Sequence, residues 1–228
     1  MQIKVLASGS KGNCYWVSDG ITPLLIECGI PFKALQKALD FNTFKIKGCL
    51  ISHEHGDHSR SAADLVRMGI DVYASTGTIE AIKVAGILPI IANPFTIRSW
   101  IIYPFPIEHD AAEPFGFVLQ SGSERLLYLT DTPYSHYRFS GLTHLMLECN
   151  YSLDLLKDNV LSGEVDRAVK SRVLRSHMGL ETLIEMLKAN DLSQVVEIWL
   201  LHLSDSNSDA EMFKKRVQEA TGKIVKVA

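Results

Sequence analysis

The stretch most suited to chemistry in this sequence is residues 53–58 (HEHGDH), which holds three imidazoles and two carboxylates. It follows the apolar run 48–51, which is typical of a short buried strand. Turns favour Gly, Asn, Asp and Ser and have no need of three histidines, so a hydrated turn explains this composition poorly. Because α/β folds place their sites where such strands end, the stretch indicates a metal site.

The spacing within this stretch suits two metal ions. On an extended segment alternate side chains point the same way, so His53 and His55 can reach one ion. Asp57 and His58 follow the turn at Gly56 and can reach a second ion. The site therefore needs further donors from elsewhere in the chain.

Further donors follow three other predicted strands. His109 comes after the strand at 103–107, Asp131 after the apolar run 127–129, and His202 after the run 199–201. One histidine at a strand end is more often structural than functional. Repeated placement changes that interpretation, because polar residues at successive strand ends converge on one sheet edge.

These donors divide into two sets joined by a bridging carboxylate. One ion would be held by His53, His55 and His109, the other by Asp57, His58 and His202, with Asp131 bridging them. Imidazole and carboxylate ligands suit Zn²⁺, with Mn²⁺ or Fe²⁺ as alternatives. Two ions about 3.5–4 Å apart can activate a shared water and neutralise charge on a phosphoryl oxygen.

The strands and helices that must position these residues are predicted to follow a simple order along the chain. Strands and helices come first, the pattern is β-rich from residue 88 to about 129, and helices and strands return after that. A helix is expected over 59–68, helices over 151–190, and strands over 195–201 and 223–227. With 46% hydrophobic residues and no linker or repeat, we expect one α/β domain over 1–228, with two sheets flanked by helices.

The net charge and the cysteine pattern limit the kinds of partner and compartment expected for this protein. The net charge of −3 gives no overall basic field for nucleic acid. The four scattered cysteines form no C-x-x-C pair, which suits a reducing compartment better than a zinc ribbon or a disulfide framework. No signal-peptide layout or membrane-length apolar run is present. We expect a cytoplasmic protein without a membrane partner.

The ligand series at 53–58, His109, Asp131 and His202 resembles that of the metallo-β-lactamase fold superfamily, over nearly the whole chain. The resemblance implies a four-layer αββα sandwich, two mixed β-sheets flanked by helices, with a dinuclear site at the sheet edge. Residues 9–14 (GSKGNC) and 201–207 (LHLSDSN) resemble the YycJ/WalJ-type branch. Members of that branch are metallohydrolases with nuclease or phosphodiesterase activity.

Two further residues resemble parts of ribonuclease Z. His177 opens a helix before the last ligand strand, and Glu148 ends a buried strand. The resemblance implies that His177 donates a proton to the leaving oxygen, oriented by Glu148, and that Asp57 belongs to the catalytic set. It also implies a homodimer. Without the resemblance, His177 would cap its helix and Glu148 would pair with an arginine.

The sequence departs from these relatives at two places. Glu27 stands where the superfamily usually has an aspartate that orients the histidine loop, so we leave Glu27 outside the ligand set. Only 21 residues separate His109 from Asp131. This spacing leaves no room for the arm with which ribonuclease Z grips transfer RNA, so a role in tRNA maturation is disfavoured.

The leading hypothesis is a dinuclear-metal-dependent phosphodiesterase that uses a metal-bridging hydroxide. Its substrate would be a nucleic-acid end, as for an exonuclease, or a small or cyclic nucleotide. The basic run Arg167, Lys170, Arg172 and Arg175 before His177 supports this, although such a run is also typical of a solvated helix face. Two alternatives stay open: a hydrolase of a small ester, thioester or lactone, and a non-catalytic metal- or nucleotide-binding module.

Overall fold

The computed structural model describes all 228 residues, and their strands form two β-sheets. The first sheet has the order β1-β2-β3-β4-β5-β6, and the second contains β7 to β13. Both sheets combine parallel and antiparallel pairs and are flanked by helices, which confirms the predicted fold class. The chain is built of two compact units, described separately below: 1–106 with 111–123, and 107–110 with 124–228. The prediction that they act as one domain stays a prediction.

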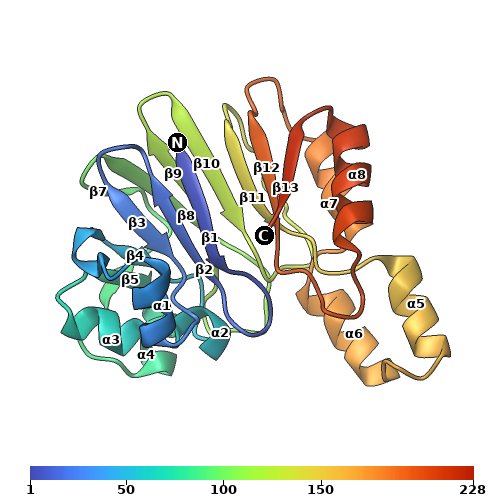
Figure 1. Ribbon diagram of the computed structural model, residues 1–228, viewed down its shortest axis with the longest axis horizontal. Helices are drawn as coiled ribbons and strands as arrows, with labels where there is room; N and C mark the ends of the chain where they lie inside the picture. Colours follow the sequence, from blue (N-terminus) through green and yellow to red (C-terminus); the bar gives the residue numbers. More distant parts are fainter. The chain divides into compact units, whose positions relative to one another are not determined.

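The first unit contains the six-stranded sheet and three further strands. Its strands are β1 (Gln2–Ala7), β2 (Cys14–Ser18), β3 (Pro23–Ile26), β4 (Cys49–Leu50), β5 (Val72–Ser75), β6 (Leu88–Ile90), β7 (Phe95–Ile97), β8 (Trp100–Pro106) and β9 (Phe115–Ser121). Its helices are α1 (Phe32–Ala38), the 3₁₀ turn η1 (Thr43–Lys45), α2 (Gly56–Ser59), α3 (Ala62–Arg67) and α4 (Thr76–Ile82). β1 to β3 pair antiparallel, and β3 to β6 run parallel (Figure 1).

β3 and β4, at the centre of this sheet, are apolar along their whole length, as expected for parallel strands covered on both faces. Leu25, Cys49 and Val72 have no exposed surface and belong to one core cluster with residues of α1 and α3. This core fixes the short strand β4, and the histidine-rich stretch begins three residues after it.

The helix predicted over 59–68 is wrong in its extent. The chain forms the single turn α2 at Gly56–Ser59 and a separate helix α3 at Ala62–Arg67. The break has a tertiary cause, because Ser61 donates from its hydroxyl to the carbonyl of Ile30 and from its N–H to that of Cys28. The turn α2 is thereby tied to the segment that follows β3.

The second unit is built on four parallel strands. They are β10 (Glu124–Leu129), β11 (His144–Glu148), β12 (Glu197–Leu201) and β13 (Ile224–Val227). Its helices are α5 (Leu153–Leu161), α6 (Arg167–Ser176), α7 (Leu180–Lys188) and α8 (Ala210–Thr221). α7 and α8 contact each other, and α8 contacts β13 (Figure 1). Gly222, with φ 66°, ends α8.

The predicted helical region 151–190 is divided into three helices, of which α5 and α6 form a hairpin (Figure 1). The hairpin has a small core of its own around Leu156, Val165 and Val173. The longest helix of the chain, α8, has 12 residues. No helix combines the length and the apolar character needed to cross a membrane.

Candidate metal centre

The first unit brings His53 and His55 together directly after β4. Nε2 of His53 lies 3.1 Å from Nδ1 of His55, and the two rings stand at 84° to each other. Two nitrogens bound to one tetrahedral zinc at 2.0–2.1 Å lie about 3.3 Å apart. The spacing of this pair therefore fits two ligands of a single ion.

Asp57 and His58 form a second pair at the start of α2. Oδ2 of Asp57 lies 3.4 Å from Nε2 of His58, again the separation of two neighbouring ligands. Nδ1 of His58 faces Glu27 at 3.6 Å, and the fully buried Glu27 carboxylate accepts the N–H of Ser52 at 3.3 Å. Glu27 therefore lies behind His58 and holds the start of the 53–58 stretch.

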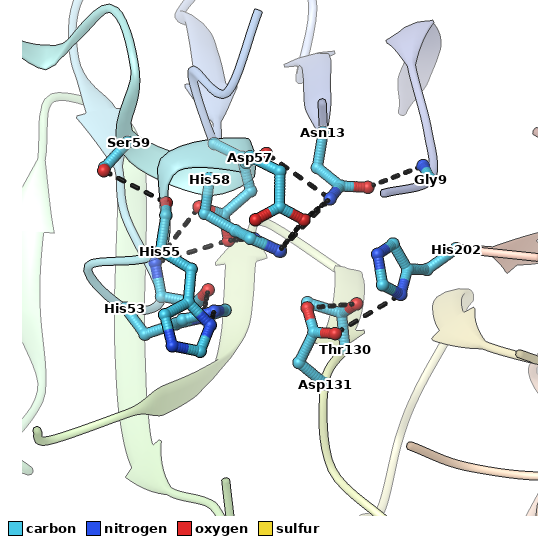
Figure 2. A network of polar contacts seen from close by, with 12 residues as sticks. Gly9, Asn13, His53, His55, Asp57, His58, Ser59, Thr130, Asp131 and His202 are labelled. Carbon is cyan, nitrogen blue, oxygen red and sulfur yellow. Dashed lines mark hydrogen bonds and ion pairs between the residues drawn. The ribbon is translucent and has the colours of Figure 1, made fainter. Parts of the chain in front are cut away.

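Asn13 is a residue of this centre that sequence reasoning missed. Its Oδ1 accepts bonds from the N–H of Gly9 and the hydroxyl of Tyr15, both at 3.0 Å, which fixes the orientation of the amide. Its Nδ2 faces Oδ2 of Asp57 at 3.5 Å and Nε2 of His58 at 3.1 Å (Figure 2). The main-chain N–H of Asn13 donates to the carbonyl of Asp57 at 2.7 Å. Asn13 thus fastens loop 8–13 to the ligand pair.

The turn carrying Asp57 also packs against Gly29 with no room for a side chain. A Cβ on Gly29 would lie 1.6 Å from the carbonyl oxygen of Asp57. The N–H of Gly29 donates to the carbonyl of Asn13 at 2.8 Å, and that of Cys28 donates to the carbonyl of His58 at 2.8 Å. The ligand pair is therefore held by main-chain bonds on two sides.

The second unit gathers four donors within 4.8 Å of one another: Asp131, Glu148, His177 and His202. The first, second and fourth follow or end the parallel strands β10, β11 and β12. The prediction that His177 opens a helix is wrong, because His177 has an extended backbone and caps the end of α6, and α7 begins only at Leu180. Asp131 and His202, two of the residues expected to converge from strand ends, therefore lie in one cluster. Glu148 lies beside His177. The alternative left open by the sequence was that Glu148 pairs with an arginine.

Glu148 makes four polar contacts. Its Oε1 lies 2.7 Å from Nδ1 of His177 and 3.0 Å from Nδ1 of His202. Its Oε2 accepts the N–H of Met178 at 3.0 Å and that of Thr132 at 3.3 Å. With both oxygens occupied in this way, Glu148 orients the two imidazoles and is not needed as a metal ligand.

Buried charges in this cluster stabilise each other. Burial would lower the pKa of His177, but the Glu148 and Asp131 carboxylates raise it to about 10. Burial would raise the pKa of Glu148, and the adjacent His177 lowers it. The pair therefore favours a protonated imidazole beside an ionised carboxylate.

Asp131 and His202 lie side by side at the strand ends, with Oδ1 of Asp131 3.3 Å from Nδ1 of His202 (Figure 2). Because Nδ1 of His202 faces carboxylates, Nε2 is the nitrogen suited to a metal. Asn150 donates to the carbonyl of His202 at 2.8 Å and was also missed, although its place two residues after β11 follows the strand-end rule. The ring of His109 lies 6.1 Å from that of His177.

Three residues of the two clusters have left-handed backbones that side chains rarely adopt. They are Glu27 (φ 62°), Asp131 (φ 50°) and His202 (φ 54°). Each comes shortly after a strand, where the chain must turn sharply to direct its side chain. Such strain persists where the surrounding structure imposes it, and it is concentrated at functional sites.

Comparison with known proteins identifies the family. The model of the β-lactamase superfamily domain matches residues 22–202. The chain belongs to the metallo-β-lactamase fold superfamily. Among curated proteins, it is 27% identical to "Exodeoxyribonuclease YycJ" of Bacillus anthracis, over 96% of this chain and 88% of that protein.

Two solved structures share the fold. The metallo-β-lactamase fold protein YhfI from Bacillus subtilis has a TM-score of 0.76 at 18% identity, covering 99% of this chain and 95% of that one. Zn²⁺-bound PqqB from Methylobacterium extorquens has a TM-score of 0.74 at 15% identity, covering 100% and 97%. With this family and the donor clusters above, the protein is a metal-dependent hydrolase.

Proposed function

We propose that the protein is a dinuclear-metal phosphodiesterase that acts on a nucleic-acid strand end. The two donor clusters would together hold two divalent ions. One ion takes His53, His55 and His109, the other takes Asp57, His58 and His202, and Asp131 bridges them. The 3.1 Å and 3.4 Å separations within the first cluster support this assignment, because both match neighbouring ligands of one ion. Zinc is the expected metal, as in the PqqB structure of the same fold.

When bound, such ions activate water and neutralise charge on a phosphoryl oxygen. The residues of the chain supply the rest. Glu27 and Asn13 hold His58 and Asp57 in place, and Glu148 holds His202. These contacts keep the ligands oriented and limit the reorganisation needed during turnover.

The observation that most supports phosphodiesterase activity is the 2.7 Å contact between Oε1 of Glu148 and Nδ1 of His177. A phosphodiester of a nucleic acid has a poor leaving group, which needs a proton as its bond to phosphorus breaks. His177, held protonated by Glu148 and Asp131, is suited to donate that proton from its Nε2 atom. A hydrolase of an activated ester or lactone has less need of such a residue.

The helix that ends at His177 supports a polyanionic substrate. α6 carries Arg167, Lys170, Arg172 and Arg175 and no acidic residue within its bounds. Three of these cations are exposed, and Lys170 is half-buried. A basic helix ending at the proton donor can contact the phosphates of a strand whose end is being cut. The curated relative named as an exodeoxyribonuclease agrees with this proposal.

The test is a substrate panel on zinc- and manganese-loaded protein, with His177→Ala beside it. The panel includes bis-p-nitrophenyl phosphate, single- and double-stranded DNA, RNA, cyclic nucleotides and a lactone. His177→Ala should slow the cleavage of DNA by about 10²–10⁴-fold and that of the p-nitrophenyl ester far less. His136→Ala, an exposed histidine of the same unit, is the matched control.

Two results would contradict the proposal. One is the absence of any phosphodiester cleavage by protein with bound metal. The other is rapid lactone cleavage that His177→Ala leaves intact. The salt dependence of KM separates a strand from a cyclic nucleotide, because a strand contact releases counterions from several phosphates and a cyclic nucleotide has one.

A further inference from the structure

A cavity of about 330 Å³ lies beside the Asp57 turn, within the first unit. Its walls are Ser10 and Lys11 from the loop after β1, and Gly56, Asp57 and Arg60 from α2 and its end; Gly29 completes the lining. None of these residues has a role in the metal assignment except Asp57. The cavity is therefore adjacent to the metal centre and distinct from it.

The lining of this cavity suits an anion. Lys11 and Arg60 carry positive charge and Ser10 adds a hydroxyl, against one carboxylate, that of Asp57. Asp57 is the proposed ligand of a divalent ion, which would offset its charge. No apolar residue is among those that line the cavity, so its side chains offer charge and hydrogen bonds as the means of recognition.

The frame of the cavity is rigid, although its cationic side chains are exposed. Loop 8–13 closes on itself through the Gly12 N–H to the Gly9 carbonyl at 3.0 Å, and Asn13 fastens it to the Asp57 turn. A Cβ on Gly12 would lie 2.7 Å from the carbonyl oxygen of Gly29, so this side admits only glycine. Lys11 and Arg60 are thus mounted on two segments held at a fixed spacing, which is what recognition of a compact anion needs.

We propose that this cavity binds a second phosphate of the substrate, the one next to the phosphodiester being cut. Lys11 and Arg60 are the specificity residues, and Ser10 donates a hydrogen bond. The inference rests on the proposed phosphodiesterase activity and adds to it the selection of substrates with a neighbouring or terminal phosphate. A substrate whose only phosphate is the one being cut has no second phosphate to occupy the cavity.

The test compares dinucleotides that differ only in a terminal phosphate. The probes are thymidylyl-thymidine and its 5′-phosphorylated and 3′-phosphorylated forms, with zinc- or manganese-loaded protein. The wild type should show a kcat/KM at least about tenfold higher for one phosphorylated form, as expected for a charged hydrogen-bonded contact. In Lys11→Ala/Arg60→Ala that ratio should fall to about one, while Lys33→Ala, an exposed lysine of α1, should retain it.

Binding gives a second readout that needs no turnover. Anisotropy of a labelled oligothymidylate on zinc-loaded His177→Ala protein, which should turn DNA over slowly, is measured at several salt concentrations and reports how many phosphates the protein binds. The slope of log K against log salt should decrease by about 0.7 for each phosphate that the double variant no longer binds.

The outcomes separate this inference from the function beneath it. If the wild type cleaves none of the three dinucleotides nor bis-p-nitrophenyl phosphate, the phosphodiesterase proposal fails. If it cleaves them without preferring either phosphorylated form, or if the preference persists in the double variant, the inference alone is overturned. An equal loss on all three dinucleotides by the double variant, with normal metal content, also overturns it, because that result indicates a general structural role.

Discussion

One oxygen of Glu148 lies between two imidazoles, 2.7 Å from Nδ1 of His177 and 3.0 Å from Nδ1 of His202. A single buried carboxylate thus orients both the proposed proton donor and a proposed metal ligand. Because the other oxygen accepts the N–H groups of Thr132 and Met178, the carboxylate cannot rotate without breaking bonds. The orientations of both imidazoles therefore depend on this one side chain.

Replacing Glu148 with glutamine should therefore affect both stability and turnover. The amide NH₂ of glutamine would face at least one N–H group that now donates to the carboxylate. Losing that hydrogen bond should lower the free energy of unfolding by about 1–3 kcal/mol. We expect kcat on DNA to fall much more than KM changes, because His177 loses the charge that holds it protonated. Glu181→Gln, at a more exposed ion pair with Arg216, is the control. An unchanged kcat would contradict the role of Glu148.

Removing divalent metal should lower both activity and thermal stability. Ions that bind only the folded chain stabilise it by about 2.7 kcal/mol when free metal is 100 times the dissociation constant. Chelation should therefore lower Tm in calorimetry, and Zn²⁺ or Mn²⁺ should restore it. His55→Ala should show a smaller metal-dependent rise in Tm than the wild type, together with reduced bound metal by elemental analysis. Equal metal content in the two proteins would exclude His55 as a ligand.

Gly29→Ala should destabilise the protein severely, because the added Cβ would lie 1.6 Å from the carbonyl oxygen of Asp57. Main chain cannot give way as a side chain can, so the cost should exceed the roughly 1–3 kcal/mol typical of an overpacked core. Gly56→Ala is the matched control, since a Cβ there meets no atom within 4 Å. Denaturant unfolding of both variants measures the difference, and equal stability would refute the close contact.

Asp19 should make the first unit sensitive to acid. Its partial burial opposes ionisation, but hydrogen bonds from Ser99, Thr22, Ser121 and Ile21 lower its pKa to about 2. Since this pKa lies below the ordinary value of 3.8, the ionised group stabilises the fold fully above about pH 4. That contribution is lost as pH falls toward 2.

Asp19→Ala should accordingly cost about 1–2 kcal/mol at pH 7 through its lost hydrogen bonds. The difference from the wild type should shrink as pH falls from 4 to 2. Urea unfolding across this range measures it, with Asp158→Ala on the exposed face of α5 as the control. A difference that does not depend on pH would show that ionisation of Asp19 is not involved.

The sequence was most informative where residues that can bind a metal follow the end of a predicted strand. Asp131 and His202 could be selected as candidate donors because polar donors follow apolar runs repeatedly along the chain. The break between α2 and α3 could not be predicted, because it depends on bonds from Ser61 to residues about 30 positions away. Local helical spacing contains no information about such bonds.

The roles of Glu27 and Asn13 were also beyond the sequence. The departure from aspartate at position 27 was visible, but its effect depends on where the longer side chain reaches. With φ 62°, the backbone of Glu27 directs a carboxylate that lies 3.6 Å from His58. Asn13 lies in a glycine-rich loop, where an asparagine is ordinarily a turn residue, and only the fold reveals its contacts with Asp57 and His58.

The α5–α6 hairpin has a consequence for motion. Its core is small, formed by Tyr151, Leu156, Val165 and Val173 with Leu153 and Val160 at its edge. Segments with so few buried contacts open locally at lower free energy than the strands of a sheet. Because α6 ends at His177, each such opening would withdraw the proposed proton donor while β11 and Glu148 stay folded. The fraction of molecules ready for turnover would then follow the local stability of the hairpin.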